Sequence, residues 1–170
     1  MCVANSRCCV RKSILSKYLL TSPTLSGVLN EMGCSISRFG WDAKNGLLEP
    51  HETISALPAG VEVQKNFTAA EILVHPSGKF VYATLRGHDS VSVFSAKKSG
   101  KLTFVQNISC GGKVPRGLGI DPTGRWLFTG NQKSDNAVEF SIEAKTGKLA
   151  ATGAELKIGS PVDVKFVAVE

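Results

Sequence analysis

The chain has 170 residues with 20 basic and 14 acidic side chains, which gives a formal net charge of +6. Residues 1–26 contain four of the basic side chains and no acid, so the remainder of the chain is nearly neutral. This distribution argues against nucleic-acid or acidic-membrane partners for the folded part, and no apolar run approaches the roughly 20 residues of a membrane-spanning helix.

Residues 1–26 leave two interpretations open. The segment is basic, bears serine and threonine and lacks acids, and its short apolar stripe around Ile14 and Leu19 is typical of an organelle transit peptide. Alternatively, it comes from a truncated or mis-spliced reading frame and is not native to the fold. A secretory signal fits poorly, because Lys17 interrupts the apolar run.

The five cysteines show no metal-binding spacing. Cys2, Cys8 and Cys9 lie in the basic segment, whereas Cys34 and Cys110 lie far apart in the rest of the chain. An odd count without a secretory signal predicts free thiols in a reducing compartment. We therefore expect a cytoplasmic protein, with organelle targeting through residues 1–26 as the alternative.

An internal repeat organises the rest of the chain. A partial copy over residues 35–48 precedes two full copies, Val74–Leu102 and Ile120–Leu149, which match at an offset of 46 residues that becomes 47 after one insertion. Periods of about 20–50 residues are typical of stacked-repeat folds, and several short strands in each repeat indicate propeller blades.

Each full repeat predicts four strands. It opens with a turn, Pro76-Ser77-Gly78 or Pro122-Thr123-Gly124, and His75 before the first turn aligns with Asp121, which predicts a turn hydrogen bond for His75. An apolar strand follows, in which Tyr82, Trp126 and Phe128 are expected to be core residues. An alternating strand and a glycine hairpin complete the unit. The chain is therefore predicted to be all-β.

Three segments resemble a known family: "GVLNEMGCSISRF", "AAEILVHPSGKFVYATLRGHDSVSVF" and "GGKVPRGLGIDPTGRWLFTGNQKSDNAVEF". They look like the last blades of the lactonase-type seven-bladed β-propellers, which include the propeller form of 6-phosphogluconolactonase and the fungal carboxymuconate-lactonizing cyclase. The resemblance covers about Gly27 to Phe166, and "SPVDVKF" looks like the family's C-terminal strand. It implies blades around a channel, with the reactive groups at one mouth.

Length indicates only part of such a ring. Seven repeats of this period need roughly 325 residues, whereas the chain has 170. We expect a basic tail over 1–26 and the C-terminal blades over 27–170, about two and a half to three blades in all. An open arc leaves blade faces uncovered, so self-association through those faces is expected as well.

The register of the repeats predicts a shared site. Asn30, Leu85 and Asn131 occupy one equivalent position, and the next position holds Glu31, Arg86 and Gln132. Each triplet follows an apolar strand, so in a radially repeated fold these side chains should face one region. Glu71 and Gly117 are equivalent at the start of an inner strand, next to Ala70 and Arg116.

These residue types suit the opening of a lactone. Glu31 is predicted as the general base for water, and Arg86 as the group that stabilises the oxyanion or grips a phosphate. The family resemblance supports both roles. Arg116 is a second phosphate candidate, and the remaining substrate-binding candidates are Glu71, Asn131 and Gln132. The scheme requires no metal and no nucleotide cofactor.

The chain also departs from the family pattern. Leucine stands at position 85 where the family has asparagine, and glycine at 117 where a polar residue is usual. SKYLLTSPTLS occupies the place of an inner strand that carries an arginine and a histidine in the family. This fragment alone is therefore expected to lack part of the site.

The resemblance implies a hydrolase, a lactonase of the 6-phosphogluconolactonase type, acting in carbohydrate metabolism in the pentose phosphate pathway. Its partner would be a small-molecule sugar lactone or phosphosugar lactone, with no nucleic acid and no membrane. One alternative is a muconate-type lactonizing cycloisomerase, and another is a non-catalytic binding module derived from a propeller.

Overall fold

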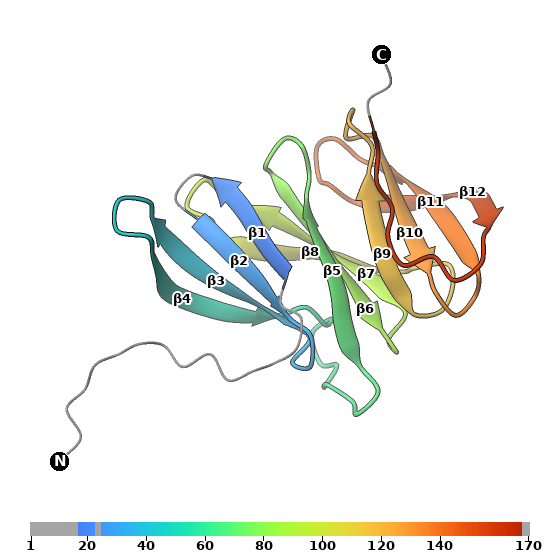
Figure 1. Cartoon of the computed structure of the whole chain (residues 1–170), viewed down its shortest axis with the longest axis horizontal. Helices are drawn as coiled ribbons and strands as arrows, with labels where there is room; N and C mark the ends of the chain where they lie inside the picture. Colours follow the sequence, from blue (N-terminus) through green and yellow to red (C-terminus); the bar gives the residue numbers. More distant parts are fainter. Residues whose placement is uncertain (1–16, 23–24, 168–170) are drawn as a thin grey trace.

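The computed structural model describes residues 17–22 and 25–167, with side chains from residue 26 onward, and it consists of three four-stranded antiparallel sheets (Figure 1). The first sheet contains β1 (Lys17–Ser22), β2 (Leu25–Asn30), β3 (Ser35–Asp42) and β4 (Leu47–Ser55). The second contains β5 (Thr68–Val74), β6 (Phe80–Arg86), β7 (Ser90–Ala96) and β8 (Leu102–Ser109). The third contains β9 (Pro115–Ile120), β10 (Trp126–Asn131), β11 (Asn136–Ile142) and β12 (Leu149–Lys157).

The strands follow chain order within each sheet, and no helix occurs in the described part of the chain. Each full repeat contains the two middle strands of one sheet and reaches its two outer strands, because its turns and hairpins fall between strands as the glycine and proline positions predicted. The all-β fold built from four-stranded blades is confirmed.

The first sheet extends further toward the N-terminus than the composition indicated. β1 pairs antiparallel with β2, with Lys17 opposite Leu29 and Leu20 opposite Ser26. The strand falls inside residues 1–26, the range that we assigned to a tail outside the propeller. Its backbone supplies the fourth strand of the sheet, which charge composition does not reveal. Residues 1–16, including the predicted transit-like part, lie outside the described residues.

Backbone hydrogen bonds close the repeated turns, and a side chain adds to one of them. Gly78 N donates to His75 O at 2.8 Å, and Gly124 N donates to Asp121 O at 2.9 Å, with both glycines at positive φ. Ser77 N also donates to His75 Nδ1 at 3.0 Å, which confirms the turn role predicted for His75. The other ring nitrogen, Nε2, lies 2.8 Å from Gly124 O of the third sheet, so one histidine links two blades.

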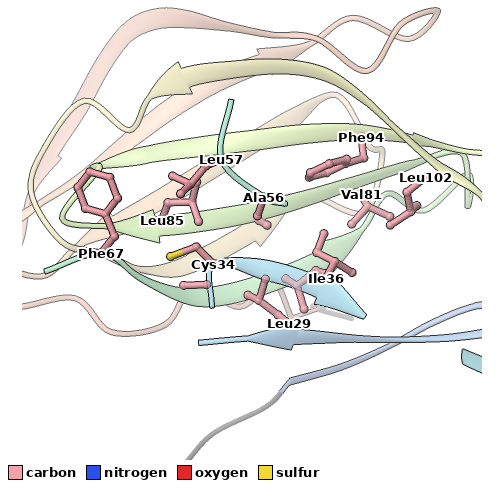
Figure 2. Close-up of a cluster of buried hydrophobic side chains, with 13 residues drawn as sticks. Leu29, Cys34, Ile36, Ala56, Leu57, Phe67, Val81, Leu85, Phe94 and Leu102 are labelled. Atoms are coloured by element: carbon pink, nitrogen blue, oxygen red, sulfur yellow. The ribbon is translucent and has the colours of Figure 1, made fainter. Parts of the chain in front are cut away.

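Two apolar clusters hold the three sheets together, one on each face of the second sheet. In the first cluster, Leu29 and Ile36 of the first sheet meet Val81, Leu85 and Phe94 of the second (Figure 2). Burial of each of these side chains stabilises the fold by about 1.5–3 kcal/mol. Leu85 is fully buried there, which gives the leucine at this position a packing role.

The second cluster lies between the second and third sheets. Tyr82 and Val93 pack against Leu118, Leu127 and Phe140. The hydroxyl of buried Tyr82 donates to Gly147 O at 3.0 Å, in the hairpin between β11 and β12. Successive residues of β6 therefore point into different clusters, so this strand is buried on both faces.

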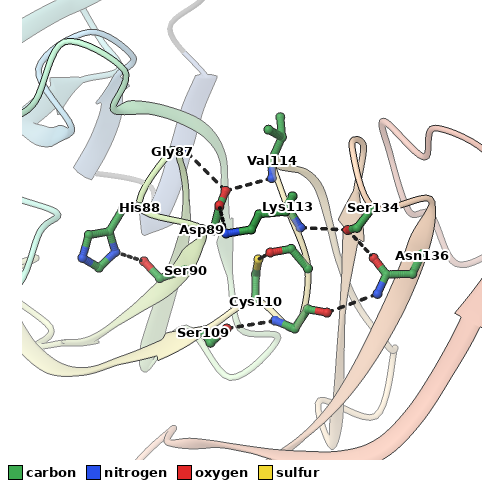
Figure 3. Close-up of polar contacts among 12 residues, drawn as sticks. Gly87, His88, Asp89, Ser90, Ser109, Cys110, Lys113, Val114, Ser134 and Asn136 are labelled. Carbon is green, nitrogen blue, oxygen red and sulfur yellow. Dashed lines mark hydrogen bonds and ion pairs between the residues drawn. The ribbon is translucent and has the colours of Figure 1, made fainter.

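An aspartate after each apolar strand ties one blade to the next. Asp89 follows β6 in the left-handed conformation (φ 53°), and its Oδ1 accepts the N–H of Val114 at 2.8 Å, where the chain enters β9 (Figure 3). Asp135 repeats this arrangement, with φ 51° and a 2.7 Å bond from Ser160 N. The two contacts are equivalent at the repeat offset, so residues 160 onward begin as β9 begins.

The segment after β12 lies against the face of the third sheet (Figure 1). Pro161 and Val164 of this segment contact the sheet at Gly130 and Gly119. The ring of Phe166 meets that of Phe128 at a centroid distance of 5.6 Å. "SPVDVKF", which resembled a C-terminal strand, thus runs beside β9 but belongs to none of the twelve strands.

Apolar side chains remain exposed on the two outer sheets. Leu47 and Leu48 of β4 are exposed in the first sheet, and Trp126 (37%) and Leu156 (62%) in the third. The prediction that Trp126 is a core residue was wrong, because it lies on the face of the third sheet that no further sheet of the described chain covers.

Candidate functional site

The ends of β2 and β6 bring Glu31 and Arg86 together. Arg86 is the last residue of β6, Glu31 follows the last residue of β2, and Arg86 Nη2 donates to Glu31 Oε1 in a short ion pair. Both side chains are only 19% exposed. The register of the repeats predicted that Glu31, Arg86 and Gln132 face one region, and the first two meet there, although 55 residues separate them.

Backbone contacts fix this pair in place. Ala69 N donates to Glu31 O at 2.8 Å, which joins the end of β2 to the start of β5. Arg86 Nη2 also donates to Ala69 O at 3.0 Å. Asn30 donates through Nδ2 to Ser35 Oγ (3.0 Å) and Ser37 Oγ (2.9 Å), which holds the turn that carries Glu31. β5 therefore holds the Arg86 guanidinium and the backbone of Glu31.

A pocket of about 280 Å³ opens beside the pair. It lies where the ends of β2 and β6 meet the starts of β5 and β9 and the C-terminal segment. Its lining residues are Glu31, Ala69, Ala70, Arg86, Arg116, Val162 and Asp163. Two carboxylates and two guanidinium groups therefore surround one cavity.

Arg116 stands at the rim of this pocket. Its side chain is exposed at the start of β9, and its Nη1 lies 3.5 Å from Gln132 Oε1. That distance is at the long limit for a hydrogen bond, so Gln132 constrains Arg116 only weakly. Arg116 is the more exposed of the two cations that line the pocket.

The other predicted substrate-binding residues, Glu71, Asn131 and Gln132, do not line the cavity. Glu71 is 4% exposed, and Asn131 is fully buried, where its Nδ2 donates to Cys110 O at 3.1 Å. Asn131 therefore supports the loop that leads to β9. Gln132 contacts Arg116 but is not among the lining residues.

Two lining residues were missed from the sequence. Val162 and Asp163 follow Arg116 and Gly117 by 46 residues, the same offset that relates the full repeats. The shared proline before each pair, Pro115 and Pro161, was the signal that extended the register to this segment.

Arg86 keeps donors for a ligand. In the described residues its hydrogen bonds use only Nη2, and its buried Nε has no partner. A guanidinium carries five N–H donors in a planar fork, so the outward-facing donors can meet an oxyanion while Nη2 holds Glu31. The pair joins a proton acceptor to a cation at the wall of one cavity.

The two described cysteines are poor nucleophiles. Cys34, whose Sγ lies 3.9 Å from Glu31 O, and Cys110 are buried free thiols, as predicted. Burial raises the pKa of Cys34, although Arg86 opposes this, and burial raises the pKa of Cys110 to about 11. A thiol reacts as its thiolate, so neither cysteine is suited to attack a substrate at neutral pH.

Neither a metal cluster nor a membrane-spanning helix occurs in the described residues. They contain no group of three or more His, Cys, Asp or Glu side chains that could hold a metal ion. They also contain no helix that is long and apolar enough to cross a membrane.

The chain is similar in sequence to several proteins that share one name. The chain is 32% identical over 141 residues to the 6-phosphogluconolactonase of Bacillus subtilis, a match that covers 82% of this chain and 40% of the relative. It is 40% identical over 98 residues to the 6-phosphogluconolactonase of Formosa agariphila, covering 56% of this chain and 28% of the relative. The chain thus spans at most about two fifths of these relatives.

Solved structures agree with the fold. The periplasmic gluconolactonase PpgL of Pseudomonas aeruginosa superposes with a TM-score of 0.80 at 30% identity, covering 86% of this chain and 40% of that one. A protein from Lactobacillus plantarum superposes with a TM-score of 0.80 at 27% identity, covering 85% of this chain and 42% of that one.

The family match extends over nearly all of the described residues. Residues 25–166 match the family described as lactonase, 7-bladed beta-propeller, including all three sheets from β2 onward and the C-terminal segment. The chain belongs to the seven-bladed β-propeller lactonase family.

Proposed function

We propose that this chain is the C-terminal portion of a lactone hydrolase of the 6-phosphogluconolactonase type. The observation that carries the proposal is the Glu31–Arg86 pair at the wall of the pocket, with Arg116 at its rim. The names of the curated relatives add support, since several are 6-phosphogluconolactonases. Because the chain spans only part of those relatives, the activity proposed belongs to the complete site.

Glu31, Arg86 and one water molecule are sufficient for the hydrolysis of a lactone. Glu31 takes a proton from water while the water oxygen attacks the lactone carbonyl carbon, and the carbonyl π electrons move onto the oxygen, where Arg86 stabilises the charge. Collapse of this intermediate breaks the bond to the ring oxygen. Protonated Glu31 then returns its proton to the departing oxygen, and a hydroxy acid leaves.

The charges of the pocket bear on the alternative activity. Glu31 and Asp163 offset Arg86 and Arg116, so this part of the cavity is close to neutral. A cycloisomerase acting on a muconate must hold a substrate with several carboxylates, for which an excess of cations is expected. The balance therefore favours a lactone with one anionic group or none.

The proposal includes a second copy of this chain as a partner. Trp126 and Leu156 in the third sheet and Leu48 in the first are exposed on the outer sheets. Exposed apolar groups of this kind favour association of sheet faces. Sedimentation velocity tests the idea: Leu156→Lys should lower the self-association constant, and an unchanged monomeric profile in both proteins would contradict it.

The test of the enzyme proposal is the hydrolysis of glucono-δ-lactone and its 6-phosphate by the native polypeptide, followed as acid release above the uncatalysed rate. Glu31→Gln removes the proton acceptor while preserving shape, so kcat should fall by about 10²–10⁴-fold.

Glu52→Gln is the matched control. Glu52 also pairs with an arginine, Arg38, in the same sheet, with Nε 3.2 Å from Oε1, but it does not line the pocket. Its activity should stay near the wild-type value. Equal activity in Glu31→Gln and wild type would refute the role of Glu31, and wild-type protein inactive on both lactones would refute the hydrolase proposal.

A further inference from the structure

The C-terminal segment places the carboxylate of Asp163 in the pocket. By the register of the repeats, this segment corresponds to an inner strand. Asp163 lines the cavity with Arg116, and it occupies the position equivalent to Gly117 and Glu71, one repeat of 46 residues further along each time. Its segment enters as β9 does, with the Ser160 N–H held by Asp135 Oδ1 at 2.7 Å. The same hydrogen bond that positions the start of β9 therefore positions the segment that carries Asp163.

The position of Asp163 depends on the absence of a side chain at Gly117. A Cβ added to Gly117 would lie 2.9 Å from both Cα and N of Asp163. These are backbone atoms, which cannot rotate away as the tip of a side chain can, so the segment itself would have to move. A Cβ at Gly119 would likewise meet Val164 Cγ1 at 2.7 Å.

Local contacts orient the carboxylate. Asp163 Oδ1 accepts the N–H of Val164 at 2.9 Å and pairs with Lys165 Nζ at 2.8 Å. The Asp163 side chain is 47% exposed, so a ligand in the cavity can reach it. Lys165 is 62% exposed and is not among the residues that line the pocket.

We propose that Asp163 is a substrate-binding residue that accepts hydrogen bonds from hydroxyl groups of a polyhydroxylated lactone ring, and that Gly117 is the positioning residue that lets it reach the pocket. Identification of the ring as a lactone rests on the proposed function. A carboxylate is an acceptor only when ionised, and its two oxygens suit neighbouring hydroxyl donors. Arg116, which lines the same cavity, suits an anionic substituent.

This arrangement predicts selection for hydroxylated substrates. A site built to hydrogen-bond a substrate hydroxyl discriminates against an analogue that lacks it, because the polar group of the protein is left without its partner. Glucono-δ-lactone should therefore depend on Asp163, whereas δ-valerolactone, which has no ring hydroxyl, should not.

The kinetic test compares the two lactones in the native polypeptide. Asp163→Ala should raise KM for glucono-δ-lactone about 10- to 100-fold, the range for one or two charge-assisted hydrogen bonds, with kcat nearly unchanged. The kcat/KM for δ-valerolactone should not change. Lys165→Met is the control, because it removes the ion pair but keeps the carboxylate, and it should leave KM near the wild-type value.

Gly117→Ala tests the positioning role. It should raise KM as Asp163→Ala does, and the double variant should be no worse than either single variant, since both changes remove the same contact. Additive effects on KM would overturn the role of Gly117. A wild-type KM in Asp163→Ala would overturn the proposal as a whole, even if Gly117→Ala fails to fold.

A binding measurement separates this inference from the proposed activity. Titration of gluconate into the protein, followed by calorimetry, needs no turnover. Weaker gluconate binding in Asp163→Ala supports the inference even if no lactone is hydrolysed and the proposed activity fails. Unchanged gluconate affinity in Asp163→Ala overturns the inference even if wild-type protein hydrolyses lactones and the activity stands.

Discussion

Replacement of Asp89 tests the physical link between neighbouring blades. Asp89 Oδ1 accepts the Val114 N–H at 2.8 Å and the Gly87 N–H at 3.3 Å (Figure 3). Its side chain is 14% exposed, so water replaces these bonds poorly. Its φ of 53° lies in the left-handed region, which aspartate tolerates better than most residues.

The magnitude follows from these contacts. A hydrogen bond to a charged acceptor contributes about 1.5–3 kcal/mol, and the longer bond from Gly87 adds less. An alanine in left-handed backbone costs about 1–2 kcal/mol. The ion pair with Lys113 adds at most about 1 kcal/mol, since that lysine is 71% exposed. Asp89→Ala should therefore lower the free energy of unfolding by about 3–5 kcal/mol.

Glycine at the same position separates the two contributions. Asp89→Gly loses the same hydrogen bonds but adopts positive φ without strain, so it should be less destabilised than Asp89→Ala by about 1–2 kcal/mol. Urea unfolding followed by fluorescence measures both values. A loss below about 1 kcal/mol in both variants would refute the hydrogen-bond argument, and equal losses would refute the backbone argument.

Three further predictions concern buried groups. Burial alone would raise the pKa of Asp121, but hydrogen bonds from Thr123, Trp126 and Arg125 outweigh it and leave that pKa lowered. The stabilisation that ionised Asp121 gives the fold should be present above the pKa of this group in the unfolded chain and lost as pH falls through its pKa in the folded chain. Asp121→Asn should therefore flatten the acid side of the plot of unfolding free energy against pH. Burial raises the pKa of Cys110 to about 11, so a disulfide reagent at pH 8 should modify native Cys110 far more slowly than the unfolded thiol, and equal rates would contradict its burial. Burial also raises the pKa of Tyr82; Tyr82→Phe should cost about 0.5–1.5 kcal/mol in urea unfolding through loss of the bond to Gly147, and no change would mean that this bond contributes nothing.

The repeat made the central part of the fold predictable. Turn prolines, glycines at positive φ and the alternation of apolar strands all recur at one offset, so local signals agreed with each other over Val74–Leu149. β1 was not predictable in this way, because its residues match no other copy and share their composition with the basic segment. Trp126 shows the limit of strand composition: which face of a sheet is covered depends on the neighbouring sheet.

The site was predictable where register alone decides it. Glu31 and Arg86 end equivalent strands, and equivalent strand ends in a radial repeat lie at one rim. Asn131 ends an equivalent strand too, but its side chain turns inward to a backbone carbonyl of the preceding loop. Such a choice depends on a local hydrogen-bond partner that no pattern in the sequence specifies. Asp163 required the register to be carried past the last complete repeat.

The most direct test of the account is a double-mutant cycle on Glu31 and Arg86, with kcat/KM for lactone opening as the measured quantity. If the ion pair acts as one unit, Glu31→Gln and Arg86→Met should each remove most of the activity, and the double variant should be little worse than either alone. Fully additive losses would contradict a shared role for the pair, and full activity in either single variant would contradict its role in catalysis.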